Sequence, residues 1–177
     1  SVLSTVGCCG DEQVPAIHVY MVLAPIAAAR NVTPFPDYSL RVLIYRALLT
    51  DRLSTIAEIA DAYGISRNHL MKVVHYLGPG GYLEPVRGKG GGVRLAIAPK
   101  RINIGTLVRD TESSTVLVEC FDKAHSGCAI QPACTLRGIL HEALEGFFQV
   151  LDCYTLADLL RNRSRLARLL DLKRSTA

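Results

Sequence analysis

The stretch LSTIAEIADAYGISRNHLMKVVHYL constrains the fold of this chain more than any other. Two segments with apolar side chains at helical spacing, Ile56–Ala60 and Leu70–Leu77, lie on either side of Gly64. A tight turn between two helices needs a residue that tolerates positive φ, and glycine does so without steric cost. Ser54 and Ser66 stand where each helix would need an N-terminal cap. The pattern therefore predicts a helix-turn-helix.

The sequence on either side of this unit completes a small domain. Pro36 and Asp37 are expected to open a preceding helix whose apolar residues share one face. The glycine-rich stretch GPGGYLEPVRGKGGGVRLAIA is not a nucleotide-binding P-loop, because Lys89 is followed by glycine and no helix follows. It predicts a β-hairpin instead, with strands at 82–87 and 93–97. A helix-turn-helix followed by a hairpin is a winged helix.

The region after this domain predicts a short helix in NIGTLVRDTE and then a long one that begins near Cys134. The long helix has a wider apolar face than one small domain needs: Leu136, Ile139, Leu140, Ala143, Leu144, Phe147, Phe148, Leu151 and Tyr154. We expect it to form a dimer; the alternative is a helix packed on its own domain alone. It would continue helically into a basic tail, with Thr155 and Asp158 as a capping pair and Cys153 as a small buried side chain.

The predicted fold is therefore mainly α with a small β-hairpin, a winged helix-turn-helix domain joined to a long C-terminal dimerisation helix. We expect a poorly ordered N-terminal extension at 1–31, the DNA-binding domain at 32–110, a cysteine-rich loop at 111–134, and the dimerisation helix with its basic tail at 135–177. The apolar stretch at 14–29 is too short to span a bilayer and lacks a basic segment before it. We therefore expect a cytoplasmic chain, without membrane association, whose thiols stay reduced.

The middle of the chain is basic, with ten Lys and Arg against five acidic residues between Asp37 and Arg101. Nucleic acid is the usual partner of such a region, although a solvated surface is the alternative. Arg can pair with guanine and Asn with adenine, while Lys can hold phosphate. The candidate DNA-binding residues are Ser66, Arg67, Asn68, His69 and Lys72 on the second helix, and Arg87, Lys89 and Arg94 on the hairpin. A homodimer would read double-stranded DNA as an inverted repeat.

Three cysteines, Cys120, Cys128 and Cys134, lie within fifteen residues. Their spacing is too wide for the paired Cys-x-x-Cys knuckles of structural zinc sites, and thiolates also favour iron–sulfur clusters. Pro132 precedes Cys134 at an expected helix N-terminus, where free amides stabilise a thiolate. Residue chemistry alone leaves an iron–sulfur cluster and zinc as comparable possibilities. No catalytic residues are expected, because the sequence shows no Ser-His-Asp arrangement or paired carboxylates, and a thiol of this loop has only His125 as an obvious base.

The segments YGISRNHLMKVVHYL, VRGKGGGVRL and LDCYTLADLL, together with the three-cysteine loop, resemble the Rrf-type bacterial regulators from about Thr33 to Leu160. Within that family the chain most resembles the nitrite- and nitric-oxide-sensitive repressors. The resemblance implies a homodimer in which the three cysteines of each subunit hold a 4Fe–4S or 2Fe–2S cluster. It also implies Asp37 as the fourth ligand, supplied by the first helix of the partner subunit. The cluster-assembly regulators of the same family use a histidine three residues after the last cysteine, where this chain has Arg137.

The resemblance further implies a transcriptional repressor that senses nitric oxide and releases DNA when its cluster is nitrosylated. Two alternatives within the same fold stay open at this point. One is a redox- or iron-responsive regulator that senses cluster loss or thiol oxidation, and the other is a regulator stabilised by zinc.

Overall fold

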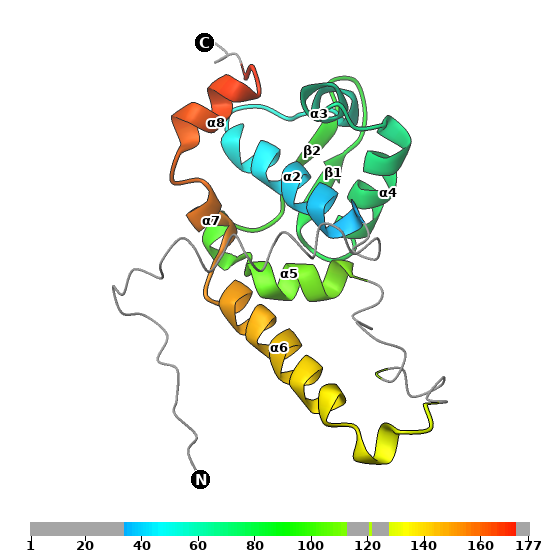
Figure 1. The fold of residues 1–177 in the computed structure, drawn as a ribbon. Coiled ribbons are helices and arrows are strands. Elements are labelled where there is room, and N and C mark those ends of the chain that lie inside the picture. Colours follow the sequence, from blue (N-terminus) through cyan, green and yellow to red (C-terminus); the bar gives the residue numbers. More distant parts are fainter. Residues whose placement is uncertain (1–33, 113–120, 122–127, 173–177) are drawn as a thin grey trace. The chain divides into compact units, whose positions relative to one another are not determined.

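A computed structural model of the chain describes residues 34–112, 121 and 128–172 (Figure 1). Its elements are α2 (Pro34–Leu48), α3 (Ile56–Tyr63), α4 (Arg67–Leu77), β1 (Leu83–Val86), β2 (Gly92–Leu95), the 3-10 helix η1 (Pro99–Arg101), α5 (Ile104–Thr111), the 3-10 helix η3 (Gln131–Ala133), α6 (Thr135–Asp152), α7 (Leu156–Leu159) and α8 (Arg163–Leu169). The extension predicted at 1–31, together with Cys120 and His125, lies outside the described residues. No helix in the described ranges combines the length and the apolar character that crossing a bilayer requires.

Helix α2 is the centre of the winged-helix domain. It contacts α3, α4, α5, α7, α8 and β2, and Figure 1 shows it running between these elements. Leu43 of α2, Ile59 of α3, and Leu70 and Leu77 of α4 are all less than 2% exposed. Burying a leucine or isoleucine side chain fully contributes roughly 1.5–3 kcal/mol, so this core supplies much of the stability of the domain.

The helix-turn-helix forms as predicted, with one correction at its first cap. Gly64 adopts φ 65° between α3 and α4, and the Ser66 side chain accepts from the His69 amide at the start of α4. Thr55, not Ser54, caps α3, because Thr55 and Glu58 form a reciprocal capping box. Ser54 is fully buried instead, and its backbone pairs with Val93 of the hairpin. The adjacent residues thus have different roles: Thr55 caps α3, and Ser54 joins the core to the hairpin.

The predicted hairpin is confirmed and is shorter than its sequence pattern. Strands β1 and β2 pair antiparallel from Leu83↔Leu95 to Val86↔Gly92. Leu83 and Val93 are 2% and 3% exposed and anchor the hairpin to the helical core. The segment between the strands, 87–91, is the tip of the wing.

Helices α5 and α6 meet at a close backbone approach. A Cβ built on Gly105 would lie 3.0 Å from the backbone nitrogen of Asp152 and 1.9 Å from its Oδ1, so a larger residue cannot stand at this position without a shift. The Asn103 side chain caps α5 and also donates to the Asp152 carbonyl oxygen at 2.7 Å. The last turn of α6 is therefore fixed against the first turn of α5.

The C-terminal region differs from the predicted continuous helix. Helix α6 ends at Asp152, and Cys153 is its exposed C-cap, so the prediction of a buried mid-helix cysteine is wrong. The chain leaves the helix here because Tyr154 and Leu156 form backbone hydrogen bonds with Ile104 and Ile102. The predicted Thr155–Asp158 capping pair is confirmed at the start of α7.

The close approach at Gly105 generates a stability prediction. Gly105→Ala should lower the free energy of unfolding by about 1–3 kcal/mol, because the added methyl overpacks against Asp152. Gly138→Ala is the matched control, since nothing lies within 4 Å of a Cβ at that position in α6. It should be neutral or stabilising by up to about 1 kcal/mol. Urea unfolding at one protein concentration measures both, and equal effects of the two substitutions would contradict the prediction.

Candidate DNA interface and metal centre

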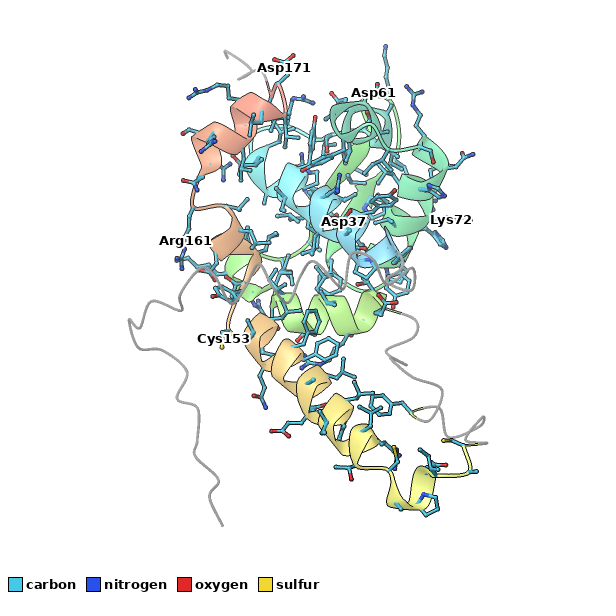
Figure 2. All side chains as sticks on the ribbon, in the orientation of Figure 1. Asp37, Asp61, Lys72, Cys153, Arg161 and Asp171 are labelled. Carbon is cyan, nitrogen blue, oxygen red and sulfur yellow. The ribbon has the colours of Figure 1, made fainter. Side chains whose placement is uncertain are left out.

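Helix α4 separates a buried face from a polar, exposed face. Its apolar residues Leu70, Val73, Val74 and Leu77 are 0–8% exposed and pack on the core. The predicted contact residues Ser66, Arg67, Asn68, His69 and Lys72 are all exposed in the first turns of the helix and its cap. Figure 2 shows Lys72 on the outer side of α4. The N-terminal part of α4 therefore presents the side chains that a recognition helix uses in a major groove.

Two of these residues have neighbours on other helices. Arg67 Nη2 lies 3.5 Å from Asp61 Oδ1 of α3, and both side chains are well exposed, 65% and 71%. Such an exposed ion pair contributes little energy, so the guanidinium can exchange it for a base edge. The His69 ring lies 6.1 Å from the Tyr38 ring of α2, centroid to centroid. His69 thus links the reading face of α4 to the first helix.

The wing carries exposed Arg87 and Lys89 at its tip, and neither forms an ion pair with any residue that the structure describes. Arg94 is engaged differently: its Nε and Nη2 donate to the two carboxylate oxygens of Glu84 at 2.9 and 2.7 Å. Glu84 and Arg94 are register partners across the hairpin. Sequence reasoning missed this pairing. The signal was available, because Glu84 and Arg94 lie at similar distances from the turn on either side of it. Arg94 thus stabilises the strands that project Arg87 and Lys89.

Two of the three predicted cysteine ligands lie at the start of α6. Cys128 is exposed, η3 follows it, and the half-buried Cys134 is the N-cap of α6. The Cys134 side chain forms no capping hydrogen bond with this 18-residue helix. The predicted position of Cys134 at a helix N-terminus is confirmed, and the positive end of the helix dipole favours an anionic ligand there.

Asp37 stands in the first turn of α2, with its side chain exposed (Figure 2). Arg41, one helical turn later, forms an ion pair with it at 2.8 Å. The hydrogen bond to Asp37 raises the pKa of Arg41, whose guanidinium also lies 5.7 Å from the centre of the Tyr63 ring. Burial raises the pKa of Tyr63 to about 12. The i,i+4 spacing was the signal for the Asp37–Arg41 pair, which the sequence reasoning missed.

One chain does not assemble the predicted ligand set from its described part. Within those ranges, no three His, Cys, Asp or Glu side chains are grouped so that they could hold a metal ion. Asp37 therefore does not join Cys128 and Cys134 within one chain. The donor chemistry nevertheless fits an iron–sulfur cluster, because thiolates are its usual protein ligands. Cys120, the third predicted thiolate ligand, lies outside the described residues.

Helix α6 carries an apolar stripe that its own chain leaves exposed. The stripe consists of Leu136, Ile139, Phe147 and Val150, which are 37–60% exposed. These residues fall on one side of the helix at 100° per residue. Phe148 lies on another side, is 6% exposed and contacts α5 through Arg109. The predicted wide apolar face therefore divides into one side that meets α5 and another that faces away from the core.

Comparison with known proteins matches this arrangement to one family. The model of the Rrf2 family, described as an iron-dependent transcriptional regulator, matches residues 32–162. The HTH-type transcriptional regulator NsrR of Bacillus subtilis is 50% identical over 144 residues, which cover 81% of this chain and 99% of that protein. NsrR of Halalkalibacterium halodurans is 49% identical over the same coverage.

Solved structures support the same fold. The structure titled T. potens IscR has a TM-score of 0.61 at 23% identity and covers 79% of this chain and 93% of that one. CymR, the global cysteine regulator of B. subtilis, has a TM-score of 0.58 at 24% identity, with 72% and 94% covered. These likenesses confirm the predicted winged-helix fold. The family match and the NsrR relatives together show that the chain belongs to the Rrf2 family of transcriptional regulators.

Proposed function

We propose that this chain is a transcriptional repressor that holds an iron–sulfur cluster and releases its DNA operator in response to nitric oxide. The observation that carries the proposal is the placement of Cys134 as the N-cap of α6, in a chain about 50% identical to NsrR proteins. These relatives favour nitric oxide over the redox- or iron-responsive alternative and over zinc.

The proposed active form is a homodimer built on α6. The exposed stripe of Leu136, Ile139, Phe147 and Val150 is apolar, and packing it against a second copy removes it from water. A twofold dimer uses the same surface of both chains, so one stripe meets its equivalent. The same symmetry presents two recognition helices to the two halves of an inverted repeat.

Cys120, Cys128 and Cys134 of one subunit would hold the cluster, with Asp37 of the second copy as the fourth ligand. When bound, the cluster supplies iron that reacts with nitric oxide. Asp37 has an alternative partner in its own chain, because Arg41 donates to its carboxylate from Nε at 3.1 Å. A carboxylate that leaves the site is therefore received by a charged neighbour and is not left unpaired.

Residues beside Asp37 contact the recognition helix directly. Phe35 packs edge-on against Tyr76 of α4, with ring centroids 5.3 Å apart, and Tyr38 approaches His69. A change in the position of the first turn of α2 would therefore reach both ends of α4. Through these ring contacts, the segment that carries Asp37 is directly connected to α4.

The direct test titrates anaerobically purified, cluster-loaded protein with nitric oxide. Visible absorption and the anisotropy of a labelled duplex, selected from genomic DNA by the same protein, are followed together. We expect the absorption bands to collapse and the duplex to dissociate over the same range of nitric oxide. A colourless protein after reconstitution, or a duplex that stays bound after the bands collapse, would overturn the proposal.

Cysteine substitutions test the ligand assignment. Cys128→Ser should abolish most of the cluster absorption and bound iron after anaerobic reconstitution, because one of three thiolates is lost. Cys153→Ser is the matched control, since Cys153 lies exposed at the opposite end of α6. It should retain the wild-type spectrum and iron content. Equal iron content in the two variants would show that Cys128 is not a ligand.

Arg67→Ala tests the reading of bases by α4. The dissociation constant for operator DNA should rise about 5–150-fold, the range that one lost bidentate base contact accounts for. Binding to a scrambled duplex should change much less. Lys89→Ala is the comparison, because a phosphate contact affects both duplexes alike and lowers the salt slope by about 1. Equal loss on both duplexes for Arg67→Ala would reduce its role to a phosphate contact.

Ile139→Glu tests the proposed dimer. A charge in the centre of the exposed stripe should shift the protein to monomers in sedimentation velocity, because the carboxylate would lose its water on association. Gln149→Glu places the same charge on another side of α6 and should leave the dimer intact. A dimer that survives Ile139→Glu would exclude the stripe as the interface.

A further inference from the structure

Helix α5 binds α6 through Arg109. Nη1 and Nη2 of Arg109 donate to the two carboxylate oxygens of Asp152, both at 2.7 Å. The same guanidinium lies 4.3 Å from the centre of the Phe148 ring. The bidentate geometry and the ring contact fix the direction of the last turn of α6 relative to α5.

The next residue of α5 binds the DNA-reading elements. The Tyr82 hydroxyl donates to Oδ2 of Asp110 at 2.6 Å, and the Tyr76 hydroxyl donates to the Asp110 carbonyl oxygen. Tyr76 lies in the last turn of α4, and Tyr82 immediately precedes β1. Tyr82 is 8% exposed, and burial, followed by its bond to Asp110, raises its pKa. Asp110 thus ties the end of the recognition helix to the start of the wing.

Consecutive residues of a helix point about 100° apart, so one short helix can contact two neighbours at once. Helix α5 does this with Arg109 and Asp110. It cannot turn freely between them, because Ile104 and Leu107 are 4% and 0% exposed in the core. Helix α5 is therefore held by α6 on one side and by α4 and the start of the wing on another.

We propose that Asp110 is a positioning residue that makes the orientation of the recognition helix and the wing depend on α6, the helix that begins at Cys134. This inference rests on the proposed function and adds the route by which the cluster end of the molecule reaches the DNA. It assigns to Tyr76 and Tyr82 a role in signalling rather than in contact with DNA.

The test uses hydroxyl deletions that preserve the rings. In the full-length Tyr76→Phe/Tyr82→Phe variant, operator affinity is measured for cluster-loaded and cluster-free protein, and the ratio is compared with wild type. Tyr45→Phe is the matched control, because Tyr45 is 3% exposed and its hydroxyl forms no hydrogen bond with the described residues. In wild-type protein, we expect the operator affinities of the cluster-loaded and cluster-free forms to differ about 5–150-fold. In the double variant, this difference should fall to about 2–3-fold or less. Its cluster spectrum and the ratio of the control should not change.

An unchanged ratio in the double variant would overturn the inference. Equal weakening of DNA binding in both states would also overturn it, since that result indicates only a structural role. If wild-type protein binds DNA equally in both states, the proposed function fails. The coupling of α6 to α4 and the wing through α5 is then tested by a measurement that does not involve DNA.

That measurement is the rate of amide hydrogen exchange in cluster-free protein. Asp152→Ala removes the ion pair that orients α6 on α5 and should speed exchange of the amides of 67–77 and 83–86. In the Tyr76→Phe/Tyr82→Phe background, the same substitution should cause no further increase. An equal increase in both backgrounds, or none in either, would show that α5 does not transmit the displacement.

Discussion

The junction between α5 and α6 is the contact on which the arrangement of this molecule depends. An exposed ion pair such as Arg109–Asp152 adds little to stability, so it does not hold the junction by itself. The strength comes from the close backbone approach at Gly105 and from the burial of Phe148. The ion pair contributes direction, because two parallel hydrogen bonds specify how the helices face each other. This junction joins α6, whose N-cap is Cys134, to the winged-helix domain that carries the exposed polar face of α4.

Helix α2 has a comparable double role. Its first turn presents Asp37 to solvent, while its last turns are buried among most other elements of the domain. Arg46 is 4% exposed, and burial lowers its pKa; Nη1 donates to Ser54, and Nε has no partner in the described part of the chain. A buried guanidinium with an unmet donor is costly, and the hydrogen bond to Ser54 offsets part of that cost. The backbone of Ser54 in turn pairs with the wing. The helix with the proposed ligand thus also supports the hairpin.

The sequence predicted the local elements well and their long-range partners poorly. Gly64 and Ser66 mark the turn of the helix-turn-helix because their conformational and capping roles depend on neighbours a few residues away. The first cap was misassigned between Ser54 and Thr55, since both carry hydroxyls and only burial distinguishes them. Cys153 was expected inside a helix, because the apolar pattern continues through it. The chain turns there to form backbone hydrogen bonds with residues about fifty positions earlier.

The sequence by itself determined the two helices of the helix-turn-helix, where the wing turns, and which polar residues cluster at the start of α4. These features follow from periodicity and from interactions within four residues, which the order of amino acids contains directly. Only the tertiary structure decided that Arg94 pairs with Glu84, that Asp37, Cys128 and Cys134 form no three-ligand group within the described part of one chain, and that Arg109 and Asp110 hold different neighbours. Those partners lie 10 to 43 residues apart, and their meeting depends on how whole elements pack around the core.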